Sequence, residues 1–490
     1  MMLDTDLESV QEGRQLLQQA KLAQAKMRNM TQDEVDRIVH SMAQVASQEA
    51  GRLASMAVDE TGYGKVEDKL TKNLFASRDV YESIKAKKTV GIISRNEQEQ
   101  VWEVAEPVGI VAGIVPSTNP TSTAIFKALI AAKSRNAIVF SPHPSAAKCT
   151  NEAVKVLQEA AQRAGAPDGL ISCVTNPTLA SARELMNHKL TDLILATGGT
   201  DMVKAAYSSG KPAFGVGPGN VPVYIHSSAN LGKAVKQIIQ SKTFDYGTIC
   251  ASEQAIVVEQ SIKRKVKREL ESEGAYFLDE YEKKRIEDII LVNGRLNPSI
   301  VGKSPQRLAE MAKIIIPEKA KLLIAEETNV GKSHPFSLEK LSPILALYTV
   351  QDSQEASNVC NELLELGGLG HTIGIHAENQ DIIERFGLEQ KVSRVIVNSG
   401  TTFGGIGATT GIAPSMTLGC GTYGNNVSSD NIGPEHLLNT KRIAFGVREM
   451  KNEHSLGETS NQSTPPANER SISRAEVMDI VKSVLQELKL

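Results

Sequence analysis

Between residues 108 and 198, short apolar runs alternate with stretches that have the composition of helices. The runs VGIVAGIVP, AIVFSP, LISCVT and LTDLILATG are rich in branched residues, and longer helix-like stretches separate them. A buried strand, a helix and a second strand form a βαβ unit, which places neighbouring strands parallel in one sheet. The alternation therefore predicts an α/β fold with a parallel sheet, and we place this domain at residues 101–243.

A second α/β region follows at about residues 244–428. Five apolar runs, QAIVVEQ, KLLIAEE, ILALYTV, HTIGIHA and SRVIVNSG, have the length and composition of buried strands. The glycine-rich stretch TTFGGIGATTGIAPSMTLGCGTYGNN at its end is typical of loops and turns. Ahead of both regions, residues 1–100 predict a helical segment, in which Thr31 and Glu34 fit a capping box.

The size and charge of the chain exclude several classes of protein. With 490 residues it is too long for one compact core and suits two or three domains. The net charge of -3 does not indicate a basic surface that would bind nucleic acid. No apolar run approaches the length that spans a bilayer. The acidic, amphipathic N-terminus is unlike a secretory signal, so we expect a cytoplasmic protein with no membrane partner.

The cysteines predict chemistry at one or two positions at most. There are five, odd in number and far apart, which favours reduced thiols over disulfides or a metal site. Cys250 differs from the others because a glycine and small residues surround it, directly before the strand-like run QAIVV. That setting suits a nucleophile, but a cysteine beside a strand is more often only packed there. The remaining cysteines are Cys149, Cys173, Cys360 and Cys420.

The C-terminal stretch has a composition of its own. Residues 451–470 are polar, contain Pro-Pro and predict a flexible linker. Residues 471–490 predict an amphipathic helix that begins with a capping box at Ser473 and Glu476. Its apolar face consists of Val477, Ile480, Val481, Val484, Leu485 and Leu488. A helix with such a face must bury it against a partner.

Several segments, in order over about residues 7–450, resemble the CoA-acylating branch of the aldehyde dehydrogenase superfamily. An ordered set of this kind is far more specific than a single glycine motif. The segments are PSTNPTSTAIFKALI (116–130), SPHPSA (141–146), ATGGTDMVKAA (196–206), GVGPGNVPV (215–223), FDYGTICASEQ around Cys250, EKLSPILA (339–346) and GLGHTIGIH (368–376).

The resemblance implies the aldehyde dehydrogenase fold, an α/β architecture in three parts. A Rossmann-like nucleotide-binding domain, residues 101–243, would lack the usual Gly-x-Gly-x-x-Gly turn, and no such motif follows its first strand. The catalytic domain, residues 244–428, would carry Cys250. Residues 429–450 would form an oligomerisation extension, and we expect a homodimer or homotetramer.

The resemblance also implies three catalytic residues. Cys250 matches the family nucleophile, which adds to an aldehyde as a thiolate and ends as a thioester. Asn119 matches an oxyanion donor, although an Asn in a Pro-flanked turn is usually a backbone cap. His371 matches a histidine of the acylating branch, which would help deprotonate the CoA thiol or orient the acyl-enzyme. The ordinary alternative for His371 is a hydrogen-bonded core residue.

The cofactor that the resemblance implies is NAD. Gly198 and Gly199 open a helix after a strand, and the free N–H groups of a helix N-terminus bind phosphate. Ser141 and His143 would lie near the adenosine ribose, and Glu339 would hold the nicotinamide ribose. The implied cofactor-binding residues are therefore Ser141, His143, Thr197, Gly198, Gly199 and Glu339.

One absence points to the second substrate. Hydrolytic aldehyde dehydrogenases carry a water-activating glutamate in a segment that matches GVGPGNVPV here, which contains no acidic residue. Without a base for water, the thioester should persist until a CoA thiol arrives. We therefore expect reversible NAD-dependent oxidation of a short-chain aldehyde to acyl-CoA, with CoA as cosubstrate.

Two other functions stay open at this point. One is a hydrolytic aldehyde dehydrogenase that releases a free acid, and the other is a non-catalytic cargo or scaffold protein that has kept the fold. Residues 471–490 also resemble the encapsulation peptides by which enzymes of this family bind the shell of bacterial microcompartments. The ordinary alternative for such a helix is a coiled-coil or oligomer contact.

Overall fold

The structure is a computed structural model that describes residues 4–448 and 473–487. Contacts divide the chain into two units, Met1–Glu97 with Val101–Ile443, and Gln98–Gln100 with Ala444–Leu490. The predicted C-terminal helix is α17 (Arg474–Glu487) of the second unit, and its capping box forms, since Glu476 N–H donates to Ser473 Oγ at 3.3 Å. The predicted linker 451–470 lies outside the described residues.

The N-terminal segment is helical as predicted, but it also contains a strand. The capping box of α2 is present, since Thr31 N–H donates to the Glu34 carboxylate at 2.8 Å and Glu34 N–H to Thr31 Oγ1 at 3.3 Å. β1 (Gly91–Asn96), inside the expected helical range, pairs antiparallel with β2 (Val101–Pro107). The helices are α1 (Thr5–Met27), α2 (Gln32–Gln48), α3 (Ala50–Thr61), α4 (Val66–Leu74) and α5 (Val80–Ile84).

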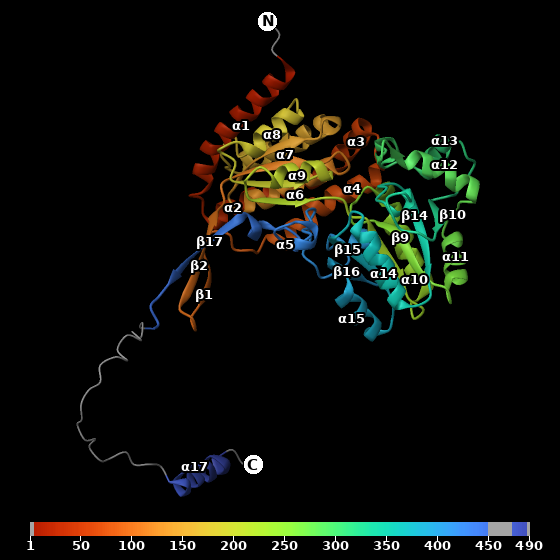
Figure 1. The fold of residues 1–490 in the computed structure, drawn as a ribbon. Coiled ribbons are helices and arrows are strands. Elements are labelled where there is room, and N and C mark those ends of the chain that lie inside the picture. Colours follow the sequence, from red (N-terminus) through yellow and green to blue (C-terminus); the bar gives the residue numbers. More distant parts are fainter. Residues whose placement is uncertain (1–3, 449–472, 488–490) are drawn as a thin grey trace, which may run out of the picture. The chain divides into compact units, whose positions relative to one another are not determined.

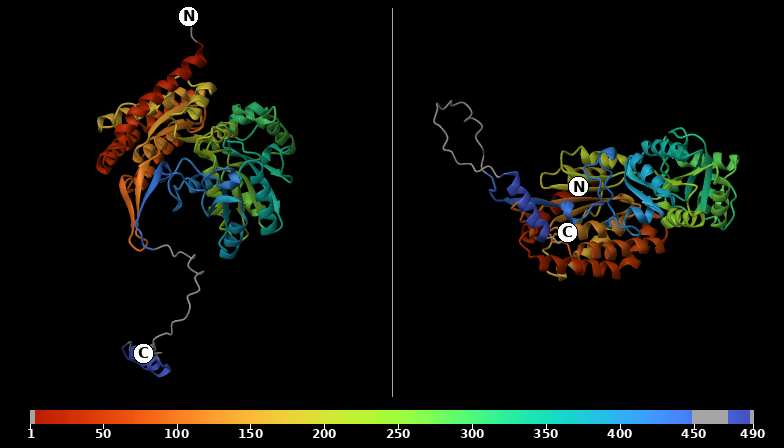
Figure 2. Two further views of the ribbon diagram at one scale, coloured as in Figure 1. Left: turned by 60° about the vertical axis from the view of Figure 1, so that its left-hand side comes forward. Right: turned by 90° about the horizontal axis from the view of Figure 1, so that it is seen from below.

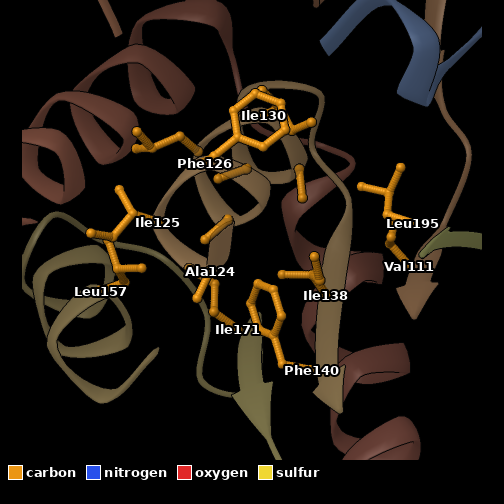
Figure 3. Packing of buried hydrophobic residues seen from close by; sticks show 14 of the residues in the cluster. Val111, Ala124, Ile125, Phe126, Ile130, Ile138, Phe140, Leu157, Ile171 and Leu195 are labelled. Carbon is orange, nitrogen blue, oxygen red and sulfur yellow. The ribbon is translucent and has the colours of Figure 1, made fainter. Parts of the chain in front are cut away.

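The first sheet has five parallel strands in the order β5-β4-β3-β6-β7. The four apolar runs predicted as strands are confirmed, and helices α6 and α7 pack on the face opposite to α1 and α8. Side chains of α6 and the strands fill the space between them (Figure 3). The elements are β3 (Ile110–Val115), α6 (Pro120–Lys133), β4 (Ala137–Pro142), α7 (Ala147–Arg163), β5 (Ile171–Cys173), α8 (Leu179–Asn187), β6 (Leu193–Thr197), α9 (Thr200–Tyr207) and β7 (Ala213–Val216).

The second sheet has seven parallel strands in the order β10-β13-β14-β9-β8-β15-β16. All five predicted strands are present in it. β8 (Val221–Ile225) also belongs to this sheet, so the chain leaves the first sheet earlier than the boundary at residue 243 that we expected. The strands that follow are β9 (Glu253–Glu259), β10 (Ala275–Phe277), β13 (Leu322–Glu327), β14 (Ile344–Val350), β15 (Gly370–His376) and β16 (Val392–Val397).

Helices cover both faces of the second sheet. One buried apolar cluster packs α10 and α11 on one face, and another packs α12 to α15 on the opposite face. The two sheets with their helices lie side by side, red to yellow and green to cyan in Figure 1, and Figure 2 shows the same separation. The helices are α10 (Leu231–Thr243), α11 (Lys263–Ser272), α12 (Glu280–Ile290), α13 (Pro305–Ala312), α14 (Ser353–Glu365), α15 (Gln380–Glu389) and α16 (Thr401–Gly405).

The segment expected to be an oligomerisation extension, residues 429–450, contains strand β17 (Leu438–Ala444). β17 joins β2 at the edge of a three-stranded sheet, β1-β2-β17, and most of its residues are exposed. Across the parts of the chain that the structure describes, no helix is long and apolar enough to cross a membrane.

Candidate active site

Cys250 lies in the loop between α10 and β9, three residues before the strand begins. It is partly exposed, whereas the other four cysteines are buried. The loop turns tightly, because Asp245 and Tyr246 have φ angles of 47° and 51° and Gly247 has 74°. This left-handed run is rare for residues other than glycine and brings the thiol to the amino end of the central strands.

The segment GVGPGNVPV (215–223) connects β7 to β8, and its Gly219 lies against the Cys250 backbone. A Cβ atom at Gly219 would lie 1.7 Å from the carbonyl oxygen of Cys250, so only glycine allows this approach. The segment offers no carboxylate to water at this point. Its one link to an acid is the Gly219 N–H, which donates to Oε1 of Glu339 at 2.9 Å.

His371, at the start of β15, contacts the nucleophile directly. Its Nε2 lies 3.2 Å from Cys250 Sγ, and its Nδ1 lies 3.0 Å from the Thr372 hydroxyl. Burial, and secondarily the Arg394 guanidinium, lowers the pKa of His371 to about 3. The ring is therefore neutral at physiological pH, and it is a poor proton acceptor in this state. The structure thus brings together two of the three predicted catalytic residues.

Arg394 of β16 is hydrogen-bonded to the backbone of His371. This residue was not predicted from the sequence. The side chain is only 4% exposed, and its guanidinium donates to His371 O at 2.9 Å, Gly419 O at 2.7 Å and Thr372 Oγ1 at 3.2 Å. These acceptors are neutral, and a buried cation without good hydrogen bonds would be costly. An arginine inside the predicted buried strand SRVIVNSG was the available signal.

The surroundings of Cys250 favour the protonated form of its thiol. Burial, followed by the nearby charges of Glu339 and Cys420, raises the pKa of Cys250 to about 12, and Arg394 opposes that rise. A thiolate is the reactive form of cysteine. Activation therefore requires a change in the surroundings of the sulfur when substrates bind.

Asn119 does not act as a backbone cap. It is the N-cap residue of α6, but its side chain makes no capping hydrogen bond. Its Nδ2 group donates to the Thr248 carbonyl, two residues before Cys250, at 3.3 Å, and to Thr118 Oγ1 at 3.2 Å. Both amide protons are therefore donated, one to Thr118 and one to the loop of the nucleophile, and the oxyanion role of Asn119 stays a prediction.

A buried ionic cluster behind Asn119 is the second feature that the sequence did not reveal. The Asp245 carboxylate accepts hydrogen bonds from Lys72, from Lys69 at 3.0 Å and from the Thr248 hydroxyl at 2.7 Å. Burial would raise the pKa of Asp245, but the Lys72 and Lys69 ammonium groups outweigh it and lower that pKa, so the carboxylate is ionised. The lysines are on α4, far away in sequence.

Five of the six predicted cofactor residues lie at the carboxyl edge of the first sheet. In this sheet β4 lies on one side of β3 and β6 on the other, so the chain continues in opposite directions from β3. Parallel sheets bind ligands at such a topological switch point. Ser141 and His143 lie at the end of β4, and Thr197, Gly198 and Gly199 lie between β6 and α9.

Two observations at this edge fit a dinucleotide. Gly199 is the exposed N-cap of α9, and a Cβ atom there would meet nothing within 4 Å, so phosphate can approach the helix N-terminus. Thr197 Oγ1 is buried without a hydrogen-bond partner. Glu339 lies apart from these residues, near Cys250, where its carboxylate is hydrogen-bonded to Gly219. Burial raises the pKa of Glu339.

Comparison with known proteins shows the family. Residues 3–417 match the aldehyde dehydrogenase family, and the chain belongs to it. It is 46% identical over 447 residues to the bifunctional aldehyde-alcohol dehydrogenase AdhE of Escherichia coli (strain K12). That match covers 90% of this chain but only 50% of the relative, so the chain spans about half the length of that protein.

Two solved structures extend the comparison. An acetylating aldehyde dehydrogenase from Geobacillus thermoglucosidasius is 66% identical with a TM-score of 0.91, over 92% of this chain and 100% of that one. A propionaldehyde dehydrogenase from Rhodopseudomonas palustris, with bound CoA and an acylated cysteine, is 26% identical with a TM-score of 0.79, over 88% and 97%. The predicted fold and the resemblance to acylating aldehyde dehydrogenases are confirmed.

We predict that Cys250→Ala abolishes aldehyde oxidation, because the other thiols are buried and cannot replace the nucleophile. Alanine at Cys149, Cys173, Cys360 or Cys420 should leave the activity in place. Iodoacetamide inactivation followed by peptide mass spectrometry checks this. Inactivation that follows a different cysteine would refute the assignment.

We predict that Asn119→Ala lowers kcat by ~10²-fold or more, the usual cost of losing one oxyanion donor. The fold and the affinity for NAD should stay as in the wild type, since the side chain does not cap α6. Steady-state kinetics and cofactor titration measure both. A decrease below ~10-fold would indicate a structural role instead.

Proposed function

We propose that the chain catalyses the reversible NAD-dependent oxidation of a short-chain aldehyde, such as acetaldehyde or propionaldehyde, to acyl-CoA. The proposal rests on membership of the aldehyde dehydrogenase family, on the Cys250 site and on the 66% identity to an acetylating enzyme. Because the chain spans half of its AdhE relative, only the aldehyde-oxidising half-reaction is proposed for it.

The observation that carries the proposal is the backbone approach of Gly219 to Cys250. A hydrolytic enzyme needs a carboxylate on the segment that faces the thioester, and GVGPGNVPV supplies only backbone there. No side chain of that segment can deprotonate a water molecule beside the thioester. The thioester therefore persists until a stronger nucleophile than water attacks it. A CoA thiol is such a nucleophile, and the acylated cysteine of the related propionaldehyde dehydrogenase agrees with a lasting thioester.

In the proposed reaction, the Cys250 thiol first releases its proton to water. Its Sγ atom then bonds to the aldehyde carbon, and the carbonyl oxygen becomes the oxyanion of a thiohemiacetal. The Asn119 amide and the Cys250 backbone N–H donate to that oxygen. A bound nicotinamide ring would accept the hydride that leaves the carbon. Cys250 then holds the acyl group as a thioester until transfer to CoA releases the sulfur.

The surroundings of His371 favour one of its two roles. A ring with a pKa of about 3 is a weak base for a CoA thiol. Its Nε2 nevertheless lies in hydrogen-bond contact with Sγ, and Arg394 fixes its backbone carbonyl. We therefore propose that His371 mainly orients Cys250 and the acyl-enzyme.

We propose NAD rather than NADP as the cofactor, held by Ser141, His143, Thr197, Gly198, Gly199 and Glu339. The N-terminus of α7, just after β4, is already occupied by Glu60, whose carboxylate accepts from Lys148 N–H at 2.9 Å and Cys149 N–H at 2.7 Å. A negative charge at that helix end disfavours a second phosphate on the adenosine ribose.

We propose that the enzyme is a cytoplasmic homodimer or homotetramer that resides in a bacterial microcompartment. β17 is an edge strand with exposed residues, and such an edge is suited to pairing with another chain. In α17 the side chains of Val477, Ile480, Val481 and Val484 are all about half exposed. The side chain of Leu485 is not described, and Leu488 lies outside the described residues.

We predict that sustained NADH formation requires CoA. Without CoA, only a burst of about one turnover per active site should occur, because the thioester has no way to discharge. Stopped-flow absorbance with and without CoA measures this, and the matched assay with NADP tests the cofactor. Continued release of free acid without CoA would establish the hydrolytic alternative, and no turnover at all would support the non-catalytic one.

We predict that deletion of residues 451–490 leaves kcat and oligomer size unchanged, because the site residues all lie before residue 400. Residues 471–490 fused to a fluorescent protein should enter microcompartments in a cell that makes them, since the apolar face of α17 needs a groove on a shell protein. The Val481→Asp fusion is the matched control. Dissociation of the oligomer on truncation would assign the helix to the enzyme's own assembly.

A further inference from the structure

Lys72 contacts Asn119, the proposed oxyanion donor, at the oxygen of its amide. Its ammonium group donates to Asn119 Oδ1, to Asp245 Oδ2 and, at 3.0 Å, to Thr248 Oγ1. The side chain is only 3% exposed. An ammonium group has three N–H donors and no acceptor, so these three contacts use all of its hydrogen-bonding capacity.

The contact with Lys72 decides which way the Asn119 amide faces. The oxygen and nitrogen of an asparagine amide are similar in shape, so the group could be turned over at little steric cost. Turning it over would bring an NH₂ group against an ammonium group and point the oxygen at the Thr248 carbonyl, which lies 3.3 Å from Nδ2. Both contacts would then be repulsive. The N–H groups therefore stay directed at Thr118 and at the Thr248 carbonyl, in the loop that carries Cys250.

We propose that Lys72 is a positioning residue that acts through Asn119. It holds the amide with its N–H groups directed at Thr118 and at the loop that carries Cys250, and its charge polarises the amide so that these groups stabilise the oxyanion more strongly. The inference rests on the proposed role of Asn119. It assigns α4, a helix of the N-terminal segment, an indirect part in transition-state stabilisation.

The charge on Lys72 is held in place by its neighbours. Burial, together with the like charge of Lys69, lowers the pKa of Lys72 to about 8, and the Asp245 and Asp68 carboxylates oppose that decrease. Thr248 accepts from Lys72 and donates to Asp245, so its hydroxyl links the two charges. The ammonium form prevails at neutral pH and is lost above pH 8, because a lysine is charged only below its pKa.

Lys69 provides a matched comparison one turn earlier on the same helix. It is equally buried and donates to the same Asp245 oxygen at 3.0 Å, but its other acceptor is the Thr118 backbone carbonyl at 2.9 Å. Removing either ammonium group leaves Asp245 with one cation fewer. Only the loss of Lys72 also removes the hydrogen bond that the Asn119 amide oxygen accepts from an ammonium group.

A double-mutant cycle tests the proposal. Lys72→Met should lower the rate of acyl-enzyme formation by about 10- to 100-fold, up to the cost of losing the donor itself, with KM for the aldehyde little changed. In an Asn119→Ala background, the same change should lower the rate no more than Lys69→Met does there. Lys69→Met should cause the same fold-decrease in both backgrounds. An equal effect of Lys72→Met with and without Asn119 would overturn the proposal.

The pH profile provides a test that needs no change at Lys72. In the wild type, the acylation rate should fall above pH 8 as the ammonium group loses its proton. Asn119→Ala should lack this decline, because the charge then has no amide to act on. A decline of the same size in both proteins would refute the inference. If Asn119→Ala is as active as the wild type, the oxyanion role of Asn119 fails instead, so the two failures are distinguishable.

Discussion

The buried Asp245 carboxylate is the interaction on which the active site depends. A charge that is removed from water is stable only with partners, and Asp245 has cations from α4 and a hydroxyl from its own loop. Its backbone is left-handed, and a Cβ atom at Gly64 would lie 1.8 Å from its Oδ1 atom. One carboxylate thus ties the N-terminal helices to the loop that carries Cys250, and it fixes that loop in a conformation that few sequences would adopt unaided.

Two buried cations near the nucleophile, Arg394 and Lys72, make the same kind of contact. Arg394 donates to the His371 carbonyl, and Lys72 donates to the Asn119 amide oxygen. Each cation is hydrogen-bonded to a neutral residue: the His371 ring lies against Cys250 Sγ, and the Asn119 amide donates to the Thr248 carbonyl in the same loop as Cys250. Because a neutral imidazole and a neutral amide carry their dipoles in fixed directions, charge can develop on the substrate without reorganisation of the surroundings. The acidic charge near the sulfur, from Glu339, explains in part why the resting thiol keeps its proton.

An element can be predicted from the sequence when it leaves a local pattern, and it is missed when it depends on contacts between residues far apart in the chain. Apolar runs such as VGIVAGIVP predicted strands correctly because burial on both faces leaves a local pattern. β8 was missed because Pro222 and the preceding glycines mask that pattern, so the domain boundary was expected too late. Cys250, Asn119 and His371 were proposed through resemblance. Lys72 was not, since its partner Asp245 lies 173 residues away and nothing in a helix of mixed polarity marks one lysine as buried.

The choice between acid and acyl-CoA follows from the same packing. Gly219 must be glycine because its backbone lies against the Cys250 carbonyl, and its N–H is bonded to Glu339. A side chain at position 219 would have to enter where the Cys250 backbone already lies, so an acidic substitution there would displace the loop of the nucleophile. A Cβ atom at Gly217 of the same segment would meet nothing within 4 Å. Within this segment, the contact with Cys250 therefore excludes a base at position 219 and leaves room for a side chain two residues earlier.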